Sequence, residues 1–385
     1  MSCSAEPSCT VLPGGVVLLP EITLSIPPLG QLPAGQLLRA LLPDCPPIAE
    51  PPTTLVPTLS GLTVFGDSLS DPGNLFGLTG FFPPFPYDQG RFSNGDLWVD
   101  YLADRLALPE PVQNFAVGGA LTGRDNGLDP LLSLLTDTET NLPGLLDQVD
   151  SFVNQLGESA ADPDQLYVVW AGANDLLNLP SDPAAIPDFL AASVQNVATA
   201  IGSLAQRGAD RFLVPNLPNL GLLPRALADG TGAAATALSG VFNTGLALAL
   251  EALEQDPRTD IDIVSVDLFE LTTTVLGAPA EFGFTNVTDP LLGTGGLTDP
   301  GFFWWDAQHP TTQAHGLLAE VFATELLEAG YLAPAPVTVP GPPCCGAGEK
   351  TLLTQLAAQL APWGLGLDDR WLCVQDSLTV AVEWS

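Results

Sequence analysis

Ser68, Asp306 and His309 are residue types that together can carry out nucleophilic catalysis. Ser68 follows the apolar run Leu62–Phe65, in a tight turn that contains glycine. A serine hydroxyl is a weak nucleophile until a base removes its proton, and the two histidines of the chain, His309 and His315, are the candidate bases. Asp306 precedes His309 by three residues, so its carboxylate can hold the Nδ1 proton and stabilise the imidazolium. We therefore predict that Ser68 attacks, His309 takes the proton and Asp306 orients the imidazole.

Two further loops carry groups that can stabilise the oxyanion of an acyl transfer. Gly118 and Gly119 come shortly after the apolar run Val112–Phe115, and Asn174 comes shortly after the run Leu166–Trp170. A glycine lets its backbone N–H approach a ligand closely, and an asparagine amide adds an uncharged donor. Acyl transfer needs such donors where negative charge develops. Three strand ends are thus predicted to supply the nucleophile, a backbone donor and a side-chain donor.

These loops need a scaffold that brings them to one edge. Short β-rich runs, nearly all apolar, alternate with helix-like stretches, as expected of parallel strands that are covered on both faces. We predict an α/β fold with three layers: a doubly wound, flavodoxin-like parallel sheet of about five strands, with ligands at the carboxyl ends. The predicted strands are Leu62–Phe65, Val112–Phe115, Leu166–Trp170, Arg211–Val214 and Ile261–Val266, and the predicted helices are Asp96–Leu106, Leu142–Phe152, Ala185–Gln206, Ala233–Leu253 and Thr311–Ala329.

The composition of the 385-residue chain excludes several classes of protein. Hydrophobic residues make up 46%, which excludes disorder throughout the chain, because disordered chains are poor in apolar residues. Ten Lys and Arg residues against 44 Asp and Glu residues give a net charge of −34, so no nucleic-acid partner is expected. No apolar run reaches the roughly 18–20 residues that span a bilayer, so we predict no integral membrane segment. The acidic balance fits salt adaptation or a secreted protein of low pI, and the apolar content favours the second.

All six cysteines lie near the two ends of the chain. An even number in that arrangement predicts disulfide-linked extensions and a secreted, extracellular protein, although no signal peptide pattern is visible; six free thiols in a cytosolic protein are the alternative. The absence of a C-x-x-C pair, and of a histidine near any cysteine, argues against zinc. We predict a Pro-rich extension at 1–60, a catalytic domain at 61–332, and a linker with a small extension at 333–385. The cysteines are Cys3, Cys9, Cys45, Cys344, Cys345 and Cys373.

Four short blocks together resemble the GDSL (SGNH) hydrolase superfamily, in its lipase/acylhydrolase branch. The blocks are Gly66-Asp67-Ser68-Leu69, Gly119, Gly172-x-Asn174-Asp175 and Asp306-x-x-His309-Pro310, and the resemblance covers roughly residues 62–332. It implies that Ser68 is the nucleophile, that Asp306 and His309 complete a triad, and that Gly119 and Asn174 form the oxyanion hole with the Ser68 N–H. Gly119 is preferred to Gly118 because family members carry this glycine five residues after the asparagine of the block, here Asn114.

The resemblance implies a carboxylic ester hydrolase that works through an acyl-enzyme, with no metal and no cofactor. Apolar residues near the site favour acyl chains, as in a lipase, a phospholipase or an aryl- or alkyl-esterase. A carbohydrate O-acetyl esterase and an acyltransferase on the same fold stay open, and the oligomeric state is not predicted. A non-catalytic binding protein that keeps the fold is a further alternative, against which the intact set of catalytic residue types argues.

Several polar residues near these blocks are interpreted as structural. Asp67 is expected to brace the serine turn, and Asp71 and Asn74 to hold the same loop. Asp175 is expected to be a helix cap or an anchor. His315 lies six residues after His309 on the following helix, hence on a different face, and is expected to be packed or to face solvent.

The aromatic residues near the site allow more than one interpretation. The segment Phe76–Tyr87 contains five aromatic residues and either binds acyl chains or simply packs. Trp304 and Trp305 flank Asp306 and could wall the same cleft. The segment Leu121–Pro143 is either a lid or a small surface helix. For Arg91, an ion pair at the entry to the helix Asp96–Leu106 is favoured over contact with a substrate headgroup.

Overall fold

The computed structural model describes residues 59–106, 108 and 111–332 with their side chains, and the backbone alone of residues 8–9, 23–26, 30–33, 55–57, 333–334 and 339–340. The chain divides into two units, residues 55–333 and residues 1–54 with 334–385. In the second unit, β1 (Ser8–Cys9) pairs antiparallel with β11 (Val339–Pro340), and β2 (Thr23–Ile26) pairs antiparallel with β3 (Gly30–Pro33). The predicted disulfides fall on cysteine side chains outside the described residues.

The unit of residues 55–333 is built on a five-stranded parallel sheet in the order β6-β5-β7-β8-β9. This order confirms the predicted doubly wound fold, because β5 lies inside the sheet and the chain winds outward from it in both directions. A short pair of β4 (Leu55–Pro57) and β10 (Leu332–Pro334) joins the two ends of the unit. The strands are β5 (Leu62–Gly66), β6 (Gln113–Asn114), β7 (Leu166–Trp170), β8 (Arg211–Pro215) and β9 (Asp262–Val266).

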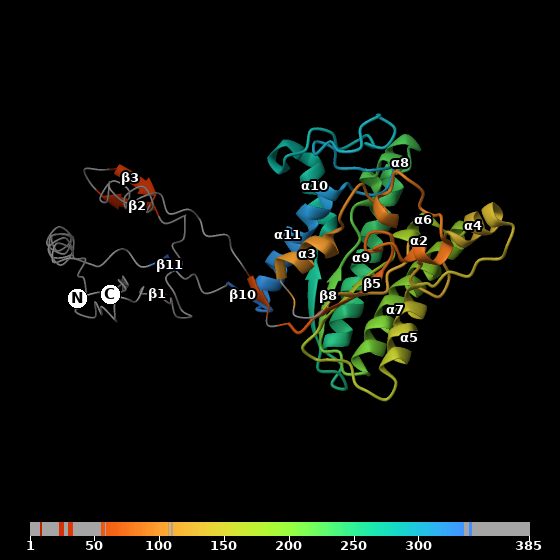
Figure 1. Cartoon of the computed structure of the whole chain (residues 1–385), viewed down its shortest axis with the longest axis horizontal. Helices are drawn as coiled ribbons and strands as arrows, with labels where there is room; N and C mark the ends of the chain where they lie inside the picture. The colour runs from red at the N-terminus through yellow and green to blue at the C-terminus, as the bar shows by residue number, and fades with distance from the viewer. Residues whose placement is uncertain are drawn as a thin grey trace, which may run out of the picture. The chain divides into compact units, whose positions relative to one another are not determined.

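Helices cover both faces of this sheet, with α3 and α11 on one side and α5, α7 and α9 on the other (Figure 1). The longer helices are α3 (Trp98–Leu106), α5 (Leu145–Leu156), α7 (Ile186–Ala205), α9 (Gly232–Glu254), α10 (Leu268–Gly277) and α11 (Thr312–Glu328). The shorter ones are α2 (Asn74–Thr79), α4 (Asp129–Thr136), α6 (Ala173–Leu177), α8 (Pro224–Ala228) and the 3-10 turns η1 (Asp88–Gly90), η2 (Pro183–Ala185), η3 (Leu220–Leu222) and η4 (Pro279–Phe282).

Alternate residues of the central strands enter two separate hydrophobic clusters, which explains why these strands are mostly apolar. Tyr167 and Val169 of β7 point into the cluster beneath α5, α7 and α9, whereas Val168 and Trp170 point into the cluster beneath α3 and α11. A polar residue at either register would therefore be buried. The apolar strand runs and the helix-like stretches of the sequence therefore both indicate the three-layer arrangement that the structure shows.

Helix α9 is, among the described residues, the one helix long and apolar enough to cross a membrane by length and composition. Phe242, Leu246 and Leu250 form its buried stripe and belong to the cluster that it shares with α5 and α7. It also contacts β9 and η3. These contacts are those of a helix in the outer layer of the α/β unit.

The segment Leu121–Pro143 contains the surface helix α4. Leu132 is fully buried beneath it, while Leu134 on its outer side is 81% exposed. Leu132 shares a small cluster with Leu75 of α2 and with Phe92. The helix is therefore anchored to the loop that follows the serine turn.

Candidate active site

The serine turn begins where β5 ends, at the carboxyl edge of the sheet. A Cβ atom on Gly66 would lie 2.5 Å from the backbone oxygen of Trp170 on β7, so this close approach requires glycine. The buried side chain of Gln148 on α5 satisfies both backbone groups of Gly66, accepting its N–H at 2.9 Å and donating to its oxygen at 2.8 Å. The turn that presents Ser68 is thus fixed from two elements. Sequence analysis does not identify Gln148, because one glutamine in an amphipathic helix carries no signal.

Ser68, His309 and Asp306 lie in one hydrogen-bonded row. Ser68 Oγ is 2.9 Å from His309 Nε2, and His309 Nδ1 is 2.7 Å from Asp306 Oδ2. Burial by itself would raise the pKa of Asp306, but the charge and hydrogen bond of His309, together with the Gln308 N–H and the Tyr87 hydroxyl, hold this pKa at about 2. An ionised carboxylate only accepts hydrogen bonds, so the imidazole hydrogen lies on Nδ1. Nε2 can then accept the proton of the Ser68 hydroxyl, which is what a serine nucleophile requires.

Tyr87 extends this row, because its hydroxyl binds Asp306. This contact could not be predicted from the sequence. The hydroxyl donates to Asp306 Oδ2 at 2.7 Å across a separation of 219 residues. The ring packs edge-on against Phe92 and Trp305, with centroids 5.9 Å away in both cases. Phe92 in turn lies 4.9 Å from the His309 ring. In the sequence, Tyr87 is one of several aromatic residues in a segment, and its partner cannot be inferred from that segment alone.

Asn174 lies beside the row on α6. Gly172, which precedes this helix, has φ +125°, and a Cβ atom there would meet the ring of Phe242 at 2.5 Å. The Asn174 side chain makes no capping bond; its Nδ2 donates to the backbone oxygen of Ala120 at 3.1 Å, which uses one of its two hydrogens. The second hydrogen is available to a ligand. This contact also joins the Asn174 loop to the loop that carries Gly119.

Gly118 and Gly119 differ in what their N–H groups do. The Gly118 N–H donates to Asp71 Oδ2 at 2.7 Å and is thereby occupied. Gly119 has φ +80°, and a Cβ atom there would meet Asn126 Oδ1 at 2.4 Å. Within the described part of the chain, the N–H groups of Gly119 and Ser68 donate to no other protein group. Gly119 is not one of the residues that line the cavity at the row, whereas Ser68 is.

Buried acidic residues hold these loops in place. Asp71 accepts the N–H groups of Gly73, Asn74 and Leu75 in addition to that of Gly118, and thereby ties the serine loop to the glycine loop. The Asn74 amide donates to the backbone oxygens of Asn114 and Ala116, both at 2.9 Å. Both residues hold the serine loop as expected.

Asp175 and Asp67 are buried carboxylates with different surroundings. Asp175 accepts the Thr122 N–H and the hydroxyls of Thr122 and Ser193, so it anchors the loop at Thr122 and helix α7 rather than capping a helix. Asp67 accepts only the Leu69 N–H, at 3.1 Å, within the described residues. Burial raises the pKa of Asp67 to about 6, although this N–H and the nearby His309 lower it.

A mostly apolar cavity opens at Ser68 and His309. Its walls come from α6, from the segment after β8 and from the loop before Asp306. Five of the residues that line it form what we call the pocket wall: Leu177, Leu220, Leu223, Phe303 and Trp304. Trp304 lines this cavity, but Trp305 does not; it is fully buried against Tyr87. Only one tryptophan of the pair therefore walls the cleft.

The aromatic segment, residues 76–87, lies outside this cavity. Phe76, Phe81 and Phe85 are exposed, Phe85 to 86%, whereas Phe82 and Tyr87 pack around Phe92. None of the five lines the cavity at Ser68. The interpretation of these aromatic residues as an acyl-binding wall is therefore not supported by the cavity.

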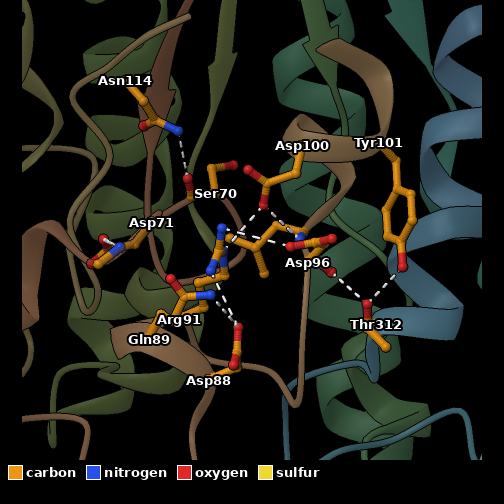
Figure 2. A network of polar contacts seen from close by, with 12 residues as sticks. Ser70, Asp71, Asp88, Gln89, Arg91, Asp96, Asp100, Tyr101, Asn114 and Thr312 are labelled. Carbon is orange, nitrogen blue, oxygen red and sulfur yellow. Dashed lines mark hydrogen bonds and ion pairs between the residues drawn. The ribbon is translucent and has the colours of Figure 1, made fainter. Parts of the chain in front are cut away.

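Arg91 and His315 have structural positions. Arg91 pairs with Asp88, Asp96 and Asp100, which fixes the entry to α3 as expected (Figure 2). His315 is fully buried, and burial, with a smaller contribution from His309, lowers its pKa to about 3. It is thus a packed, neutral histidine. Among the described residues, no group of three or more His, Cys, Asp or Glu side chains could hold a metal ion.

Comparison with known proteins identifies a single family. The model of the GDSL-like lipase/acylhydrolase family matches residues 62–322. A phosphatidylcholine-sterol acyltransferase of Aeromonas hydrophila is 27% identical over 334 residues, which cover 71% of this chain and 92% of that protein. A thermolabile hemolysin of Vibrio parahaemolyticus is 27% identical over 284 residues, and the match spans 68% of this chain but only 62% of that protein. A solved lipolytic protein of the G-D-S-L family from Veillonella parvula matches 70% of this chain and 96% of its own, with 13% identity and a TM-score of 0.36.

Proposed function

The chain belongs to the GDSL-like lipase/acylhydrolase family, and from this premise we propose that it is a serine esterase that hydrolyses carboxylic esters through an acyl-enzyme on Ser68. Family membership supports a hydrolase that acts on esters. The observation that carries the finer proposal is the row of contacts from Ser68 Oγ to His309 Nε2 at 2.9 Å and from His309 Nδ1 to Asp306 Oδ2 at 2.7 Å.

In the acylation step, Ser68 Oγ bonds to the carbonyl carbon of the ester while its proton passes to His309 Nε2. The Asp306 carboxylate holds the Nδ1 hydrogen and stabilises the imidazolium that forms. When the tetrahedral intermediate collapses, the bond to the alcohol oxygen breaks, and His309 returns the proton to that oxygen. The alcohol leaves, and the acyl group stays on Ser68 as an ester.

We assign the oxyanion hole to the N–H groups of Ser68 and Gly119 and to Asn174 Nδ2. Two observations support this assignment: these two N–H groups donate to no protein group in the described residues, and Asn174 keeps one amide hydrogen free. Gly118 is excluded as a donor, because its N–H is bound by Asp71. Fixed donors of this kind stabilise the negative charge that develops on the carbonyl oxygen.

In the deacylation step, a water molecule takes the place of the alcohol. His309 removes a proton from the water, and the resulting oxygen nucleophile attacks the acyl carbon. Collapse of the second intermediate breaks the bond to Ser68 Oγ, which regains its proton from His309. The net reaction converts ester and water into carboxylic acid and alcohol.

The pocket wall supports an acyl chain as the part of the substrate that is recognised. Leucine and aromatic side chains beside Ser68 would bury methylene groups favourably and would offer few partners to sugar hydroxyls. Transfer of the acyl group to an alcohol in place of water is the second candidate, because the Aeromonas relative that matches most of its length is named an acyltransferase. The partition of the six cysteines supports an oxidising, extracellular compartment.

Fluorophosphonate labelling and two substitutions test this proposal. We expect one covalent adduct on Ser68, and Ser68→Ala and His309→Ala should each lower kcat by about 10⁴–10⁶ on p-nitrophenyl esters without changing the melting temperature much. Ser151→Ala, on the exposed side of α5, is the matched control and should behave as wild type. A protein that takes no label at Ser68 would be a binding protein on this fold. A damaging His315→Ala with a mild His309→Ala would refute the assignment of the base.

A further inference from the structure

The Asp306 carboxylate is saturated with hydrogen-bond donors. Oδ1 accepts the backbone N–H groups of Gln308 at 2.8 Å and His309 at 2.7 Å, and Oδ2 accepts both His309 Nδ1 and the Tyr87 hydroxyl at 2.7 Å. Burial, followed by the charge of Asp306, raises the pKa of Tyr87 far above its usual value. Tyr87 is therefore a permanent neutral donor, aimed at the oxygen that also binds the imidazole.

The position of the Tyr87 hydroxyl is fixed from both sides of the residue. Its ring lies between Phe92 and Trp305, and its backbone N–H donates to Pro84 at 3.1 Å. The next residue, Asp88, donates its N–H to the Ser93 oxygen and pairs with Arg91. Figure 2 shows that Arg91 connects this end of the segment to Asp96 and Asp100 at the start of α3. Tyr87 is thus held by packing and by an ion-pair network before any substrate binds.

We propose that Tyr87 is a positioning residue that sets the strength of the base by sharing the Asp306 carboxylate with His309. The proposal rests on the proposed roles of Ser68 and His309. A donor on Oδ2 disperses the carboxylate charge, so Asp306 stabilises the imidazolium less than an unshared carboxylate would. It also prevents rotation of the carboxylate, which keeps His309 Nε2 directed at Ser68 Oγ. Tyr87 would therefore keep His309 unprotonated, and competent as a base, to lower pH.

Other ionisable groups face the same site, and the same groups are present in wild type and in a Tyr87 variant. Asp67 lies close enough to His309 for their charges to interact, and burial raises the pKa of Asp67 to about 6. His315 interacts with His309 but stays neutral. The Arg225 guanidinium reaches the site through Gln308, to which its Nη1 donates at 2.7 Å, and its backbone N–H donates to the Ala307 oxygen at 3.0 Å. A difference between wild type and a Tyr87 variant is thus attributable to the hydroxyl.

The test compares Tyr87→Phe with Tyr101→Phe. Tyr101 is the matched control, because its hydroxyl bonds to Thr312 Oγ1 at 2.8 Å on α11 and does not touch the row (Figure 2). We expect Tyr87→Phe to move the acid limb of the kcat/KM profile up by about 0.5–1 pH unit and to lower the plateau about three- to tenfold. Tyr101→Phe should superimpose on wild type. An unchanged acid limb in a folded Tyr87→Phe variant would overturn the proposal, whatever its stability.

A second readout does not depend on turnover. The chain has two histidines, so nitrogen-labelled histidine gives two sets of ring signals, which His315→Asn assigns. The titration midpoint of the His309 ring should be higher in Tyr87→Phe than in wild type. Difluorotyrosine at position 87, a stronger donor, should move both the midpoint and the acid limb the opposite way and covers the case in which Tyr87→Phe does not fold. Equal midpoints in all proteins would refute the role of Tyr87, whereas full activity of Ser68→Ala would refute the proposed function itself.

Discussion

Two regions flank Ser68 and differ in how the sequence encodes them. The aromatic segment, residues 76–87, is contiguous and conspicuous, yet three of its five aromatic rings are exposed and the other two pack around Phe92. The pocket wall is drawn from three distant segments around positions 177, 220–223 and 303–304. Each of these follows a strand or precedes Asp306, so the parallel sheet brings them to one edge. A cluster of aromatic residues in sequence therefore does not line the cavity at Ser68, whereas residues scattered along the chain do.

The two regions also divide the chemistry. The pocket side supplies Asn174, a proposed oxyanion donor, and the surfaces that would meet the acyl chain. The aromatic side supplies Tyr87 and Phe92, which contact Asp306 and His309 from behind. In the proposed mechanism, the pocket side would touch the substrate, and the aromatic side supports Asp306 and His309. Substitutions on the pocket side should change turnover and selectivity, while those on exposed aromatic positions should change neither.

The largest difference is expected at Asn174. Asn174→Ala should lower kcat by about 10²–10³ with little change in KM, because an oxyanion donor acts mainly in the transition state. On the aromatic side, Phe85→Ser should leave kcat within about twofold, since its ring is 86% exposed. Steady-state kinetics on one p-nitrophenyl ester series measures both. A loss at Asn174 that appears only in KM would show a ground-state contact instead.

The next effect concerns Asp67, on the floor of the pocket. Its pKa rises from 3.8 to about 6 on burial, so the folded protein holds this proton more tightly than the unfolded chain. Ionisation of Asp67 then lowers stability progressively as pH rises from about 4 to 6, and the whole cost, about 3 kcal/mol, is present above that range. Asp67→Asn keeps an acceptor for the Leu69 N–H and removes the charge.

Chemical denaturation at two pH values checks this expectation. Asp67→Asn should raise the free energy of unfolding by up to about 3 kcal/mol at pH 8 and by little at about pH 3, where wild-type Asp67 is mostly protonated in both states. A variant that is less stable than wild type at pH 8 would mean that the bond to the Leu69 N–H outweighs the cost of burial.

The smallest expected effect sharpens the division between the two regions. Leu177→Trp fills part of the pocket, and we expect the ratio of kcat/KM for p-nitrophenyl octanoate to that for acetate to fall about tenfold. Leu78→Trp makes the same change in the aromatic segment, at a side chain that is 61% exposed. There the ratio should stay within about twofold of wild type. An equal change of this ratio in Leu177→Trp and Leu78→Trp would contradict the distinction between the pocket wall and the aromatic segment.

The sheet could be predicted from sequence because its central strands β5, β7 and β8 are buried on both faces. The runs that contain Tyr167 and Phe212 are apolar at consecutive positions, a pattern that surface segments do not maintain. Short helices such as α2 and α6 were not predicted, since six or five residues give too little periodicity. The edge strand β6 is two residues long, shorter than the run Val112–Phe115, since only Gln113 and Asn114 pair with β5.

Within the site, proximity in sequence decided what could be predicted. Asp306 and His309 are three residues apart, and Ser68 follows a strand, so their meeting is implied by the topology. Gln148 and Tyr87 act through side chains that reach 82 and 219 residues along the chain. Their partners are backbone atoms and one shared oxygen, for which no residue pattern exists. The roles of Gly119 and Asn174 stay predictions until kinetics test them.

The loop that carries Asp306 and His309 is a self-contained piece. Trp305 donates its N–H to the His309 oxygen at 2.8 Å, and Thr311 donates to the Phe303 oxygen at 2.8 Å, so the acid and the base are fastened to each other before either meets the serine turn. Within the described residues, the 2.9 Å contact between His309 and Ser68 is the one hydrogen bond that joins this loop to the serine turn, while the Tyr87 hydroxyl holds Asp306 from a separate segment. Heat or denaturant that separates His309 from Ser68 would abolish activity in a single step, while the imidazole would stay hydrogen-bonded to Asp306. On cooling, the return of this loop to the serine turn would restore the contact between His309 and Ser68, because His309 is already bound to Asp306.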